Sequence, residues 1–586
     1  MITLSPCIRT FGVLHTYPDT GVEYSFGLFL LGFCQNLLLD KQKRLHTFLF
    51  YNQPFFAAGK DDILRMSNDI YYRPTWTCGR CNVEKQATIY YNLITGISYY
   101  FEDFSAMVIG ELLKVPRNGR IKLQNVSAFL NISMESLVPF FIQLEQLGLV
   151  SLTPVTENIV AEYRKRVSEY NRIQQQAAPR STQEKLPYDT SNAEMLYTDK
   201  VGGITSIMFE LTYNCSEKCI HCYNIGATRN DDEKSTRGNR SELTLDDYKR
   251  IIDELYELGL IKVCLTGGDP FSKPIVWDII EYLYNKEIAF DIYTNGQSIV
   301  NKTRKLADYY PRLIGISIYS GVPEVHDYIT RIKGSWDRSM IVARELSALA
   351  VPMNLKCCVM RPNVKTYYMV ADIAQELGAV PQFEVSLTDS IEGDKCVSKF
   401  LRLTDKELEI VLRDDNVPLY VGKEAPNYGG QPKLMDSNPC GAGSNSFCVT
   451  PEGNLIPCCA FHTIFGNLIE QSIADILLNC KELSYWRGLT LNDYEECGRL
   501  DYCAYCNLCP GNNFVEHGTP LEASENNCRM AKIRFGLAHK MMADGYDPLN
   551  DKSLKGRLSE LPDYTPVRIH KEMSHNFSDI KLKLNG

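Results

Sequence analysis

Residues 204–223 read ITSIMFELTYNCSEKCIHCY, and this stretch decides the fold. Its first half, residues 204–212, is apolar and β-prone, so we expect a buried strand there. Cys215, Cys219 and Cys222 follow at once in the spacing C-x3-C-x2-C. Three thiolates on one loop can ligate three irons of a cubane cluster and leave the fourth iron open. The sequence therefore predicts an iron-sulfur centre directly after a strand.

A zinc knuckle is the competing interpretation of this loop. A structural zinc ion needs four ligands in a tetrahedron, and His221 is the one further candidate beside the three cysteines. His221 is wedged between Cys219 and Cys222, where it is poorly placed to complete a tetrahedron. The spacing therefore favours the iron-sulfur interpretation.

Beyond the loop, short β-prone runs alternate with amphipathic segments over about 185 residues, which is typical of parallel βα units. In the first intervening helix we expect Thr244 and Asp247 to form a capping pair, followed by an apolar face that includes Tyr248, Ile251 and Leu255. The predicted strands are residues 204–212, 261–266, 288–294, 313–319, 353–360 and 382–387. Six such units predict an α/β fold, a partial (β/α)6 barrel of the TIM type.

The cysteine loop and the turn after the second predicted strand together resemble the radical S-adenosylmethionine superfamily. That family has C-x3-C-x2-C after its first strand with an aromatic neighbour, here Tyr223, and the second strand of this chain ends in LTGGDP. The resemblance implies that Gly267, Gly268 and Asp269 form the turn that receives the amino group of S-adenosylmethionine. Glycines let backbone groups approach a ligand closely, and such folds place their sites at the carboxyl ends of the strands.

Polar residues at the ends of later strands hold the methionine carboxylate and the ribose in this family. At the matching places this chain has Asn295, Ser317 and Arg331. It has Ser320 and Gly321 where the family commonly has Asp-Gly, a departure that bears on the ribose contacts.

The resemblance also implies the cofactors and the first chemical step. A 4Fe-4S cluster on Cys215, Cys219 and Cys222 would bind S-adenosyl-L-methionine at its open iron. One electron from a low-potential donor, such as ferredoxin or flavodoxin, would then give a 5′-deoxyadenosyl radical that abstracts a hydrogen atom from the substrate. The cofactor carries the difficult chemistry, and the protein supplies orientation and excludes water.

A second group of cysteines lies in the last third of the chain and resembles the SPASM extension. That pattern begins with a cysteine and a spacer followed by Gly-x4-Cys, which Gly453 and Cys458 fit. The later intervening residues number five, two and two, an order that differs from the usual one. The resemblance implies one or two auxiliary 4Fe-4S clusters. The expected ligands are Cys440, Cys458, Cys497, Cys503, Cys506, Cys509 and Cys528, with Cys448 and Cys459 in reserve.

Two fully ligated auxiliary clusters need more thiols than these seven, so one auxiliary iron would be open unless a reserve cysteine takes part. Plain buried thiols are common, and we interpret the other cysteines of the barrel and its flanks in that way. Cys78 and Cys81 form a lone C-x2-C pair, which fits a chance occurrence as well as a metal site. The cysteines interpreted as plain thiols are Cys264, Cys357, Cys358, Cys396 and Cys480.

Residues 87–103 read ATIYYNLITGISYYFED and predict a β-hairpin, which helical segments follow at 106–113, near 125–130 and over 137–147. A hairpin with three short helices is a winged-helix pattern. The stretch resembles the PqqD-like recognition element of enzymes that mature ribosomally made peptides. That resemblance implies binding of a leader peptide as an added strand at a sheet edge.

A DNA-binding winged helix and a domain that merely packs on the barrel are the two rival interpretations of this region. Between Asn82 and Val150 there are five basic and six acidic residues, which gives little attraction for phosphate. Peptide binding is therefore favoured over nucleic-acid binding.

Composition gives the chain its broad class. A net charge of −9 excludes a generally basic surface for nucleic acid, and 21 cysteines in an uneven distribution favour metal centres in a reducing cytoplasm. Residues 24–39 form the most apolar run, too short to span a membrane, so we expect a buried helix there. No secretory signal is recognised, and we expect a cytoplasmic protein without a membrane partner.

The chain divides into an N-terminal region of unassigned role (1–81), a winged-helix-like recognition element (82–155), a helix and linker (156–200), the partial barrel (201–400), a connecting segment (401–438), the auxiliary cluster domain (439–530), and a C-terminal helix and tail (531–586).

The predicted function is that of a radical S-adenosylmethionine, SPASM-containing maturase that modifies a precursor peptide bound through its leader, by crosslinking or thioether formation. Enzymes of the sulfatase-maturase type and small-alcohol dehydrogenases share the barrel and the auxiliary clusters, but they would not need residues 86–150. A non-enzymatic iron-sulfur carrier or sensor is disfavoured by the GGDP turn and the six βα units.

Overall fold

A computed structural model describes residues 69–177, 191–224, 242–389, 400–423, 425, 427–544 and 553–562. The helix expected at 24–39 and Cys396 lie outside the described residues, as does most of the predicted linker.

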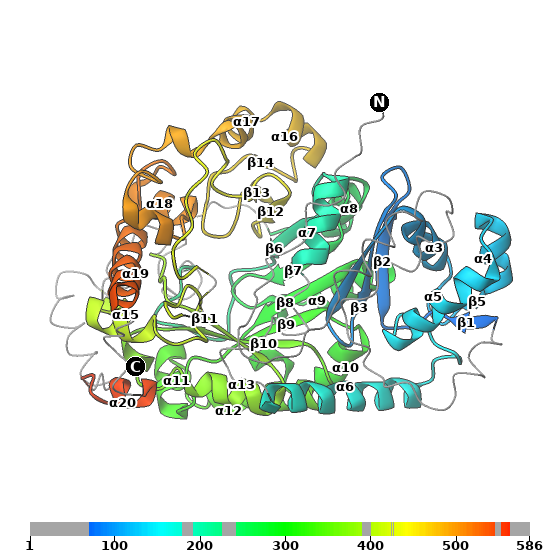
Figure 1. Cartoon of the computed structure of the whole chain (residues 1–586), viewed down its shortest axis with the longest axis horizontal. Coiled ribbons are helices and arrows are strands. Elements are labelled where there is room, and N and C mark those ends of the chain that lie inside the picture. Colours follow the sequence, from blue (N-terminus) through cyan, green and yellow to red (C-terminus); the bar gives the residue numbers. More distant parts are fainter. Residues whose placement is uncertain are drawn as a thin grey trace.

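Six parallel strands form the centre of the molecule, as the sequence predicts (Figure 1). They are hydrogen-bonded in the order β11-β10-β9-β8-β7-β6, so the chain adds each new strand beside the previous one. The last strand begins two residues earlier than predicted, because its pairing with β10 starts at Val380. The strands are β6 (Ser206–Glu210), β7 (Lys262–Thr266), β8 (Ala289–Thr294), β9 (Leu313–Ser317), β10 (Met353–Cys358) and β11 (Val380–Glu384).

Helices between these strands cover one face of the sheet and bury its core. The first helix begins with the predicted capping box, in which Thr244 and Asp247 bond each other's side chain and backbone. Tyr248, Ile251 and Leu255 are fully buried on its inner face. The covering helices are α8 (Leu245–Glu257), α9 (Val276–Asn285), α10 (Thr303–Asp308), α11 (Pro323–Thr330), α12 (Ser335–Ala348) and α13 (Met369–Leu377).

The cysteine-rich segment continues the barrel sheet, which the sequence does not predict. Its first strand, β12 (Ser446–Val449), pairs in parallel with β6, and β13 (Asn454–Ile456) and β14 (Gly466–Asn467) follow antiparallel. The segment also shares the apolar core of the barrel, because Phe447 and Trp486 belong to the main hydrophobic cluster. The helices of the C-terminal part are α15 (Asp405–Val411), α16 (Ile473–Asn479), α17 (Lys481–Gly488), α18 (Pro510–His517), α19 (Glu525–Asp544) and α20 (Leu554–Ser559).

A small N-terminal domain contains the predicted hairpin and the three predicted helices. The hairpin strands lie in a three-stranded antiparallel sheet of order β2-β3-β4. Residues 70–72, ahead of the predicted boundary, form a strand that pairs with β5 of this domain. The winged-helix assignment remains a prediction. The elements are β1 (Ile70–Tyr72), β2 (Thr77–Asn82), β3 (Ala87–Asn92), β4 (Ile97–Glu102), α3 (Asp103–Leu113), β5 (Arg120–Lys122), α4 (Leu123–Leu130) and α5 (Met134–Gln146).

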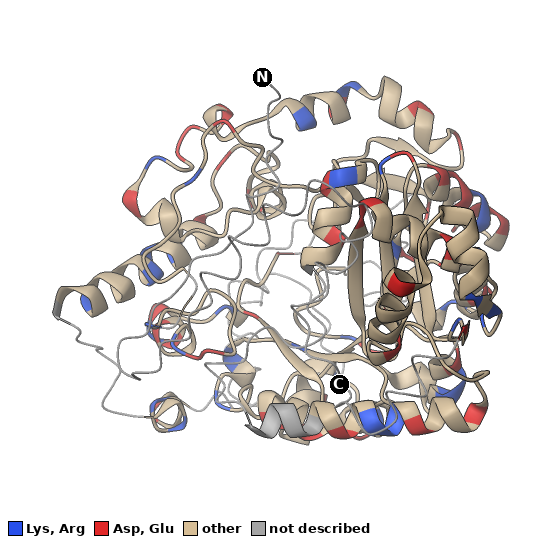
Figure 2. Cartoon of the chain, turned by 45° about the vertical axis from the view of Figure 1, so that its right-hand side comes forward, with Lys and Arg blue, Asp and Glu red and all other residues tan. Residues whose placement is uncertain are grey.

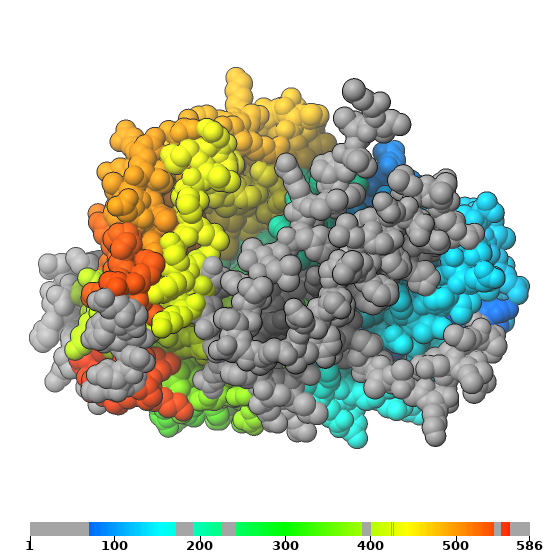
Figure 3. Space-filling view, viewed as in Figure 1, coloured from blue at the N-terminus to red at the C-terminus, as the bar shows by residue number. Residues whose placement is uncertain are grey.

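The small domain docks at the amino ends of the barrel strands. Trp76 and Tyr91 share a hydrophobic cluster with Ile261, Ala289 and Ala350, which lie just before or at the start of β7, β8 and β10. In Figures 1 and 3 the blue and cyan domain and the orange cysteine-rich segment lie at opposite ends of the molecule. The predicted polar helix, α6 (Glu157–Ala177), runs from the small domain along the barrel helices.

A buried ionic network closes the amino end of the barrel beneath this interface. Glu194, on α7 (Ser191–Val201), forms ion pairs with Lys262 and with Arg312, whose Nη1 lies 3.5 Å from Glu194 Oε1. Arg312 also donates from Nε to Asp291 Oδ1 at 2.7 Å, and the Tyr91 hydroxyl donates to Glu194 Oε1 at 3.3 Å. The network therefore joins the small domain, the linker helix and three barrel strands.

Replacing Glu194 by Gln is expected to lower the free energy of unfolding by about 3 kcal/mol, because Lys262 loses its ion-pair partner and Arg312 keeps only Asp291. Burial alone would raise the pKa of Glu194, but Arg312 and Lys262 outweigh it, and the net pKa is lowered. The stabilisation is therefore complete above the unfolded-state pKa of about 4.3 and disappears as the pH falls through the lower folded-state value. Urea unfolding of both proteins across this pH range measures it.

The matched control is Glu111→Gln, which removes the exposed i,i+3 partner of Lys114 on α3. We expect a loss of no more than about 0.5 kcal/mol there. Equal effects of the two substitutions would contradict a structural role for the network.

Charged residues of both signs are interspersed over the described elements (Figure 2). None of the described helices is long and apolar enough to cross a membrane.

Candidate functional site

The three-cysteine loop follows β6 at the carboxyl end of the barrel, where the sequence predicts it. Two backbone hydrogen bonds fix it to the end of α11. Lys218 N donates to Thr330 O at 3.0 Å, and Ile220 N donates to Ile329 O at 2.9 Å. The loop is therefore held by a helix more than 100 residues later in the sequence, a contact that no local pattern predicts.

The thiols of this loop are enclosed by protein groups. Cys215 Sγ accepts from Glu217 N at 3.4 Å and from Asn295 Nδ2 at 3.3 Å, and Cys219 Sγ donates to Glu217 Oε2 at 3.5 Å. Burial raises the pKa of the Cys215 thiol to about 12 and that of Cys219 well above its ordinary value. Ligation of iron requires the thiolate, so binding of the metal must displace the protons of Cys215 and Cys219.

Gly267 and Gly268 are required by the close approach of two backbone segments. A Cβ added to Gly267, whose φ is +131°, would lie 2.3 Å from Thr212 O, and one added to Gly268 would lie 2.4 Å from Asn214 O. Both carbonyls belong to the segment that leads into Cys215. The two glycines thus let the turn after β7 pack directly against the cysteine loop. The sequence predicted only that they let the backbone approach a ligand.

Asp269 positions the neighbouring strand end. It is fully buried, and its carboxylate accepts from Thr294 Oγ1 at 2.6 Å, from Asn295 N at 3.0 Å and from Phe271 N at 3.0 Å. Asn295 in turn donates to Cys215. The carboxylate therefore links the GGDP turn to the cysteine loop through Asn295, and both of its oxygens are already engaged within the protein.

The other two predicted cofactor contacts also lie at this end of the barrel. Ser317 is the last residue of β9 and is half-buried. Arg331 ends α11 in the left-handed region, with φ of 61°, directly after the Thr330 carbonyl that binds the cysteine loop. The six predicted contacts are thus at one end of the barrel, and their bonds to the cofactor remain predictions.

Three rings, those of His221, Tyr319 and His326, pack in a row beside the loop, and the sequence did not predict this contact. The ring of His221 packs edge-on against Tyr319 with centroids 4.7 Å apart, and Tyr319 stacks on His326 at 5.5 Å. His326 Nδ1 accepts from Tyr319 N at 3.1 Å. Burial lowers the pKa of both imidazoles to about 4, so they are neutral near pH 7. Tyr319, the last residue of the predicted strand 313–319, was the one feature of the sequence that could have indicated it.

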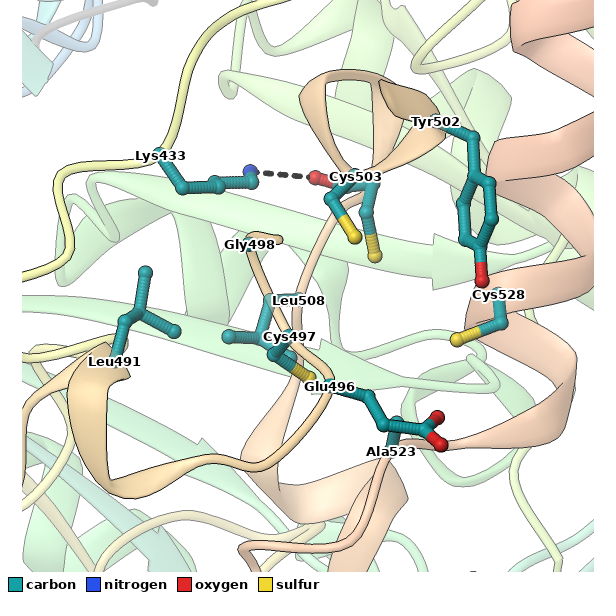
Figure 4. A pocket seen from close by; sticks show the side chains of 11 residues that line it. Lys433, Leu491, Glu496, Cys497, Gly498, Tyr502, Cys503, Leu508, Ala523 and Cys528 are labelled. Carbon is teal, nitrogen blue, oxygen red and sulfur yellow. Dashed lines mark hydrogen bonds between the residues drawn. The ribbon is translucent and has the colours of Figure 1, made fainter. Parts of the chain in front are cut away.

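Four thiols of the cysteine-rich domain line one small cavity. Figure 4 shows the sulfur atoms of Cys497, Cys503 and Cys528 turned toward the same space, and Cys506 also lines it. Lys433 donates to the carbonyl of Cys506 at 2.7 Å and holds the wall of the cavity. A cavity walled by four thiols suits a fully ligated cubane cluster.

Three further thiols form a separate group. Cys458 lies within electrostatic range of Cys440 and Cys509, and Cys509 interacts with Cys440 in the same way. The reserve cysteines Cys448 and Cys459 lie beside this group, since both interact with Cys458, and both also interact with Glu210 at the end of β6. Among the described residues, no three His, Cys, Asp or Glu side chains lie close enough together to bind a single metal ion. A cubane cluster does not need this, because each of its ligands binds a different iron.

The remaining described cysteines fit plain thiols. Cys480 caps α17, accepting from Leu483 N at 3.4 Å. Cys78 and Cys81 are three residues apart on β2, so their side chains leave opposite faces of the strand. Cys78 is buried in the interface core, whereas Cys81 Sγ contacts Ala106 O at 3.7 Å. This placement removes the C-x2-C pair as a shared metal site.

Comparison with protein families assigns two domains to the chain. The model of the radical SAM superfamily matches residues 209–365, and the model of SPASM, an iron-sulfur cluster-binding domain, matches residues 440–510. A radical SAM domain implies a 4Fe-4S cluster and S-adenosylmethionine, and a SPASM domain implies auxiliary iron-sulfur clusters. The chain is therefore an enzyme with these cofactors, and the geometry of its thiols fits them.

Several curated proteins are similar over about half of this chain. The subtilosin biosynthesis protein AlbA of Bacillus subtilis is 25% identical over 52% of this chain and 66% of its own length. The AdoMet-dependent heme synthase of Methanosarcina barkeri is 26% identical over 52% of this chain and 90% of its own length. The PqqA peptide cyclase of Ruegeria pomeroyi is 24% identical over 48% of this chain and 76% of its own length. Among solved structures, Streptococcus suis SuiB bound to its precursor peptide SuiA has a TM-score of 0.45 and 14% identity, and the match covers 78% of this chain and 99% of that one.

Proposed function

We propose that this chain, with its radical SAM and SPASM domains, is a maturase that modifies a ribosomally synthesised precursor peptide after hydrogen abstraction. The observation that carries the proposal is the cysteine loop, seated at the carboxyl end of the parallel barrel by Gly267, Gly268 and Asp269. AlbA and PqqA cyclase, named for a bacteriocin and a peptide, support the substrate class. Crosslinking or thioether formation is the expected outcome.

The residues present fit the cofactors in a specific way. Cys215, Cys219 and Cys222 would hold the cluster that binds S-adenosylmethionine, and the bound cofactor supplies the 5′-deoxyadenosyl radical. Asn295 orients Cys215, and Ser317 and Arg331 would contact the methionine carboxylate and ribose. A low-potential donor such as ferredoxin or flavodoxin would supply the electron. The cysteines of the described segments form no disulfide bonds, which fits a reducing cytoplasm, where we propose that the enzyme acts.

For the auxiliary clusters we propose a division into a closed and an open site. Cys497, Cys503, Cys506 and Cys528 would hold one cluster completely, whereas Cys440, Cys458 and Cys509 would hold the other and leave one iron free. The cavity lined by the first four thiols supports this division. An open iron suits binding of a substrate thiolate, which favours thioether chemistry.

The iron content of cysteine variants tests the division. Cys503→Ala/Cys528→Ala, which leaves two thiols in the cavity, is expected to lower the iron of the reconstituted chain by about four atoms, the content of one cluster. Adding Cys506→Ala should cost no further cluster, because the three thiols serve the same one. Adding Cys458→Ala instead should remove a second cluster, because only two thiols then remain in its group. Equal losses in the two triple variants would refute the grouping.

The small domain is the proposed recognition element for the leader of the precursor. Among the described strands, β2 and β4 are each paired on one side only, so both present an edge to which a peptide strand can be added. The domain docks at the amino ends of the barrel strands, whereas the cysteine loop lies at their carboxyl ends. A strand of five residues separates the two levels by about 17 Å, so the leader and the modified residue need at least about five extended residues between them.

Peptides of defined length test the function with the full chain. We expect the reconstituted enzyme to modify the precursor encoded beside its gene, seen by mass spectrometry as the loss of H2 per crosslink. The core without its leader should react with kcat/KM reduced at least about tenfold, which corresponds to about 1.4 kcal/mol of lost binding. Hydrogen exchange with the free leader should slow at residues 77–82 or 97–102. Slowing confined to the barrel would refute recognition by the small domain, and absence of any peptide product would refute the function.

A further inference from the structure

The inner face of the barrel contains a lysine that the predicted chemistry leaves unassigned. On β9 and β10, Ile314, Ile316 and Leu355 point outward into the main hydrophobic core. Because side chains alternate along a strand, Gly315 and Lys356 point to the other face, which is the lumen. Lys356 therefore extends into the space enclosed by the strands below the cysteine loop.

The lysine is held in place by an aromatic ring across a glycine. Lys356 Nζ lies 3.4 Å from the centroid of the Tyr293 ring on β8, although β9 separates the two strands. Gly315 makes the contact possible, since a Cβ added there would lie 2.8 Å from both Lys356 Cδ and Tyr293 Cδ1. A cation–π contact orients an ammonium group without neutralising its charge. Tyr293 and Gly315 thus fix the position of the Lys356 ammonium group in the lumen.

No carboxylate among the described residues lies within ion-pair distance of this ammonium group. Asp291, the anion below it, is engaged by Arg312 in the network that closes the barrel. On the edge strand β11, Glu384 accepts from Ser386 N at 2.7 Å. Burial lowers the pKa of Lys356, and its interactions with nearby groups, among them Cys264 and Asp291, do not offset that cost.

The neighbours of Lys356 in the sheet are hydrogen-bond donors as well. The register places Ser317 on one side of Lys356 and Gln382 on the other, each on an adjacent strand. A hydroxyl, an ammonium and an amide in one row complement a carboxylate. Gln382 is exposed on the edge strand, so the row leads from the open side of the sheet into the lumen.

We propose that Lys356 binds a carboxylate of the substrate in the barrel lumen, an acidic side chain or the C-terminus of the peptide, and positions it below the cysteine loop. The assignment rests on the proposed function. Because Ser317, a proposed cofactor contact, lies opposite Lys356 in the register, the affinity for S-adenosylmethionine is measured beside kcat/KM for the peptide to distinguish the two carboxylates.

Substitutions at Lys356 and Tyr293 test the proposal in the reconstituted full chain. Lys356→Met keeps the length of the side chain and removes the charge, and Lys356→Arg keeps the charge. We expect Lys356→Met to lower kcat/KM for the precursor peptide at least tenfold with S-adenosylmethionine affinity changed less than twofold, and Lys356→Arg to restore most of the loss. Tyr293→Leu should act like Lys356→Met, and Tyr293→Phe, which retains the ring, should not.

The peptide supplies the matching half of the experiment. Replacing its acidic residues singly by Asn or Gln, and amidating its C-terminus, should identify one carboxylate whose loss lowers kcat/KM as much as Lys356→Met does. The two changes together should cost no more than either alone. Additive losses, or no loss at all, would overturn the assignment. A fall in S-adenosylmethionine affinity instead would assign Lys356 to the cofactor and overturn it too.

A direct probe separates this inference from the proposed function. The rate at which acetic anhydride labels Lys356 is measured with and without glutarate, and glutaramide serves as the uncharged control. Glutarate should slow labelling at Lys356 and leave Lys532, an exposed lysine over the Tyr502 ring, unchanged. Without this protection the carboxylate site fails even if peptides are modified. Protection without any peptide product would retain the site and refute the maturase function.

Discussion

Replacing Cys215, Cys219 and Cys222 together by alanine is expected to abolish formation of 5′-deoxyadenosine. The three thiols are the only loop ligands that the described barrel offers at the carboxyl end of β6, and without them the cofactor has no iron to bind. Anaerobic reconstitution followed by chromatography of the nucleoside products, with and without reductant, measures the effect. The rate should fall to that of the enzyme without iron.

The auxiliary thiols provide the control for this experiment. The triple variant should keep the iron of the SPASM domain, because that domain packs on the barrel through its own strands and apolar residues. Cleavage of S-adenosylmethionine that persists in the variant would disprove the assignment of the loop. Loss of all iron, including the auxiliary clusters, would show that the substitutions unfold the chain, and single Cys222→Ala would then be the variant to measure.

Gly268→Ala is expected to reduce cleavage of S-adenosylmethionine at least about 100-fold, since a shift of about 1 Å in a catalytic constellation has that effect. The added methyl group would meet Asn214 O at 2.4 Å and Tyr213 O at 2.5 Å. These are backbone atoms, so the turn or the cysteine loop must move. Product formation and the spectrum of the cluster report the two consequences separately.

Gly429→Ala is the matched control, because no atom lies within 4 Å of the position of its added Cβ. We expect unchanged cleavage there. Activity of Gly268→Ala within a few-fold of the unchanged enzyme would contradict the inference that the glycine seats the turn against the cysteine loop. Thermal unfolding of both variants separates displacement of the site from loss of the fold.

Much of the architecture was predictable because it follows from short-range sequence patterns. The alternation of apolar runs with amphipathic segments predicted six strands, and the pair Thr244 and Asp247 predicted a helix start that the structure confirms. The hairpin at β3 and β4 follows from its aromatic runs and its turn in the same way. Such patterns depend on residues a few positions apart, so propensity and periodicity are enough to read them.

The cysteine loop depends both on local sequence and on contacts between distant segments. Its spacing and its place after a strand predict three ligands, since both are properties of one short segment. The bonds that fix it are not local: Asn295 reaches Cys215 across 80 residues, and the end of α11 holds the loop from more than 100 residues away. The sequence therefore identified the ligands, whereas tertiary packing determined how they are oriented.

The sequence by itself determined the parallel barrel, the three-thiol loop and the presence of further thiols. Only the tertiary structure decided which thiols share a cavity, that the small domain covers the amino end of the barrel, and that Lys356 meets Tyr293 over Gly315. The physical reason is that the register between strands and the burial of polar groups follow from packing among segments distant in the chain. Spacing within one segment carries no record of that packing.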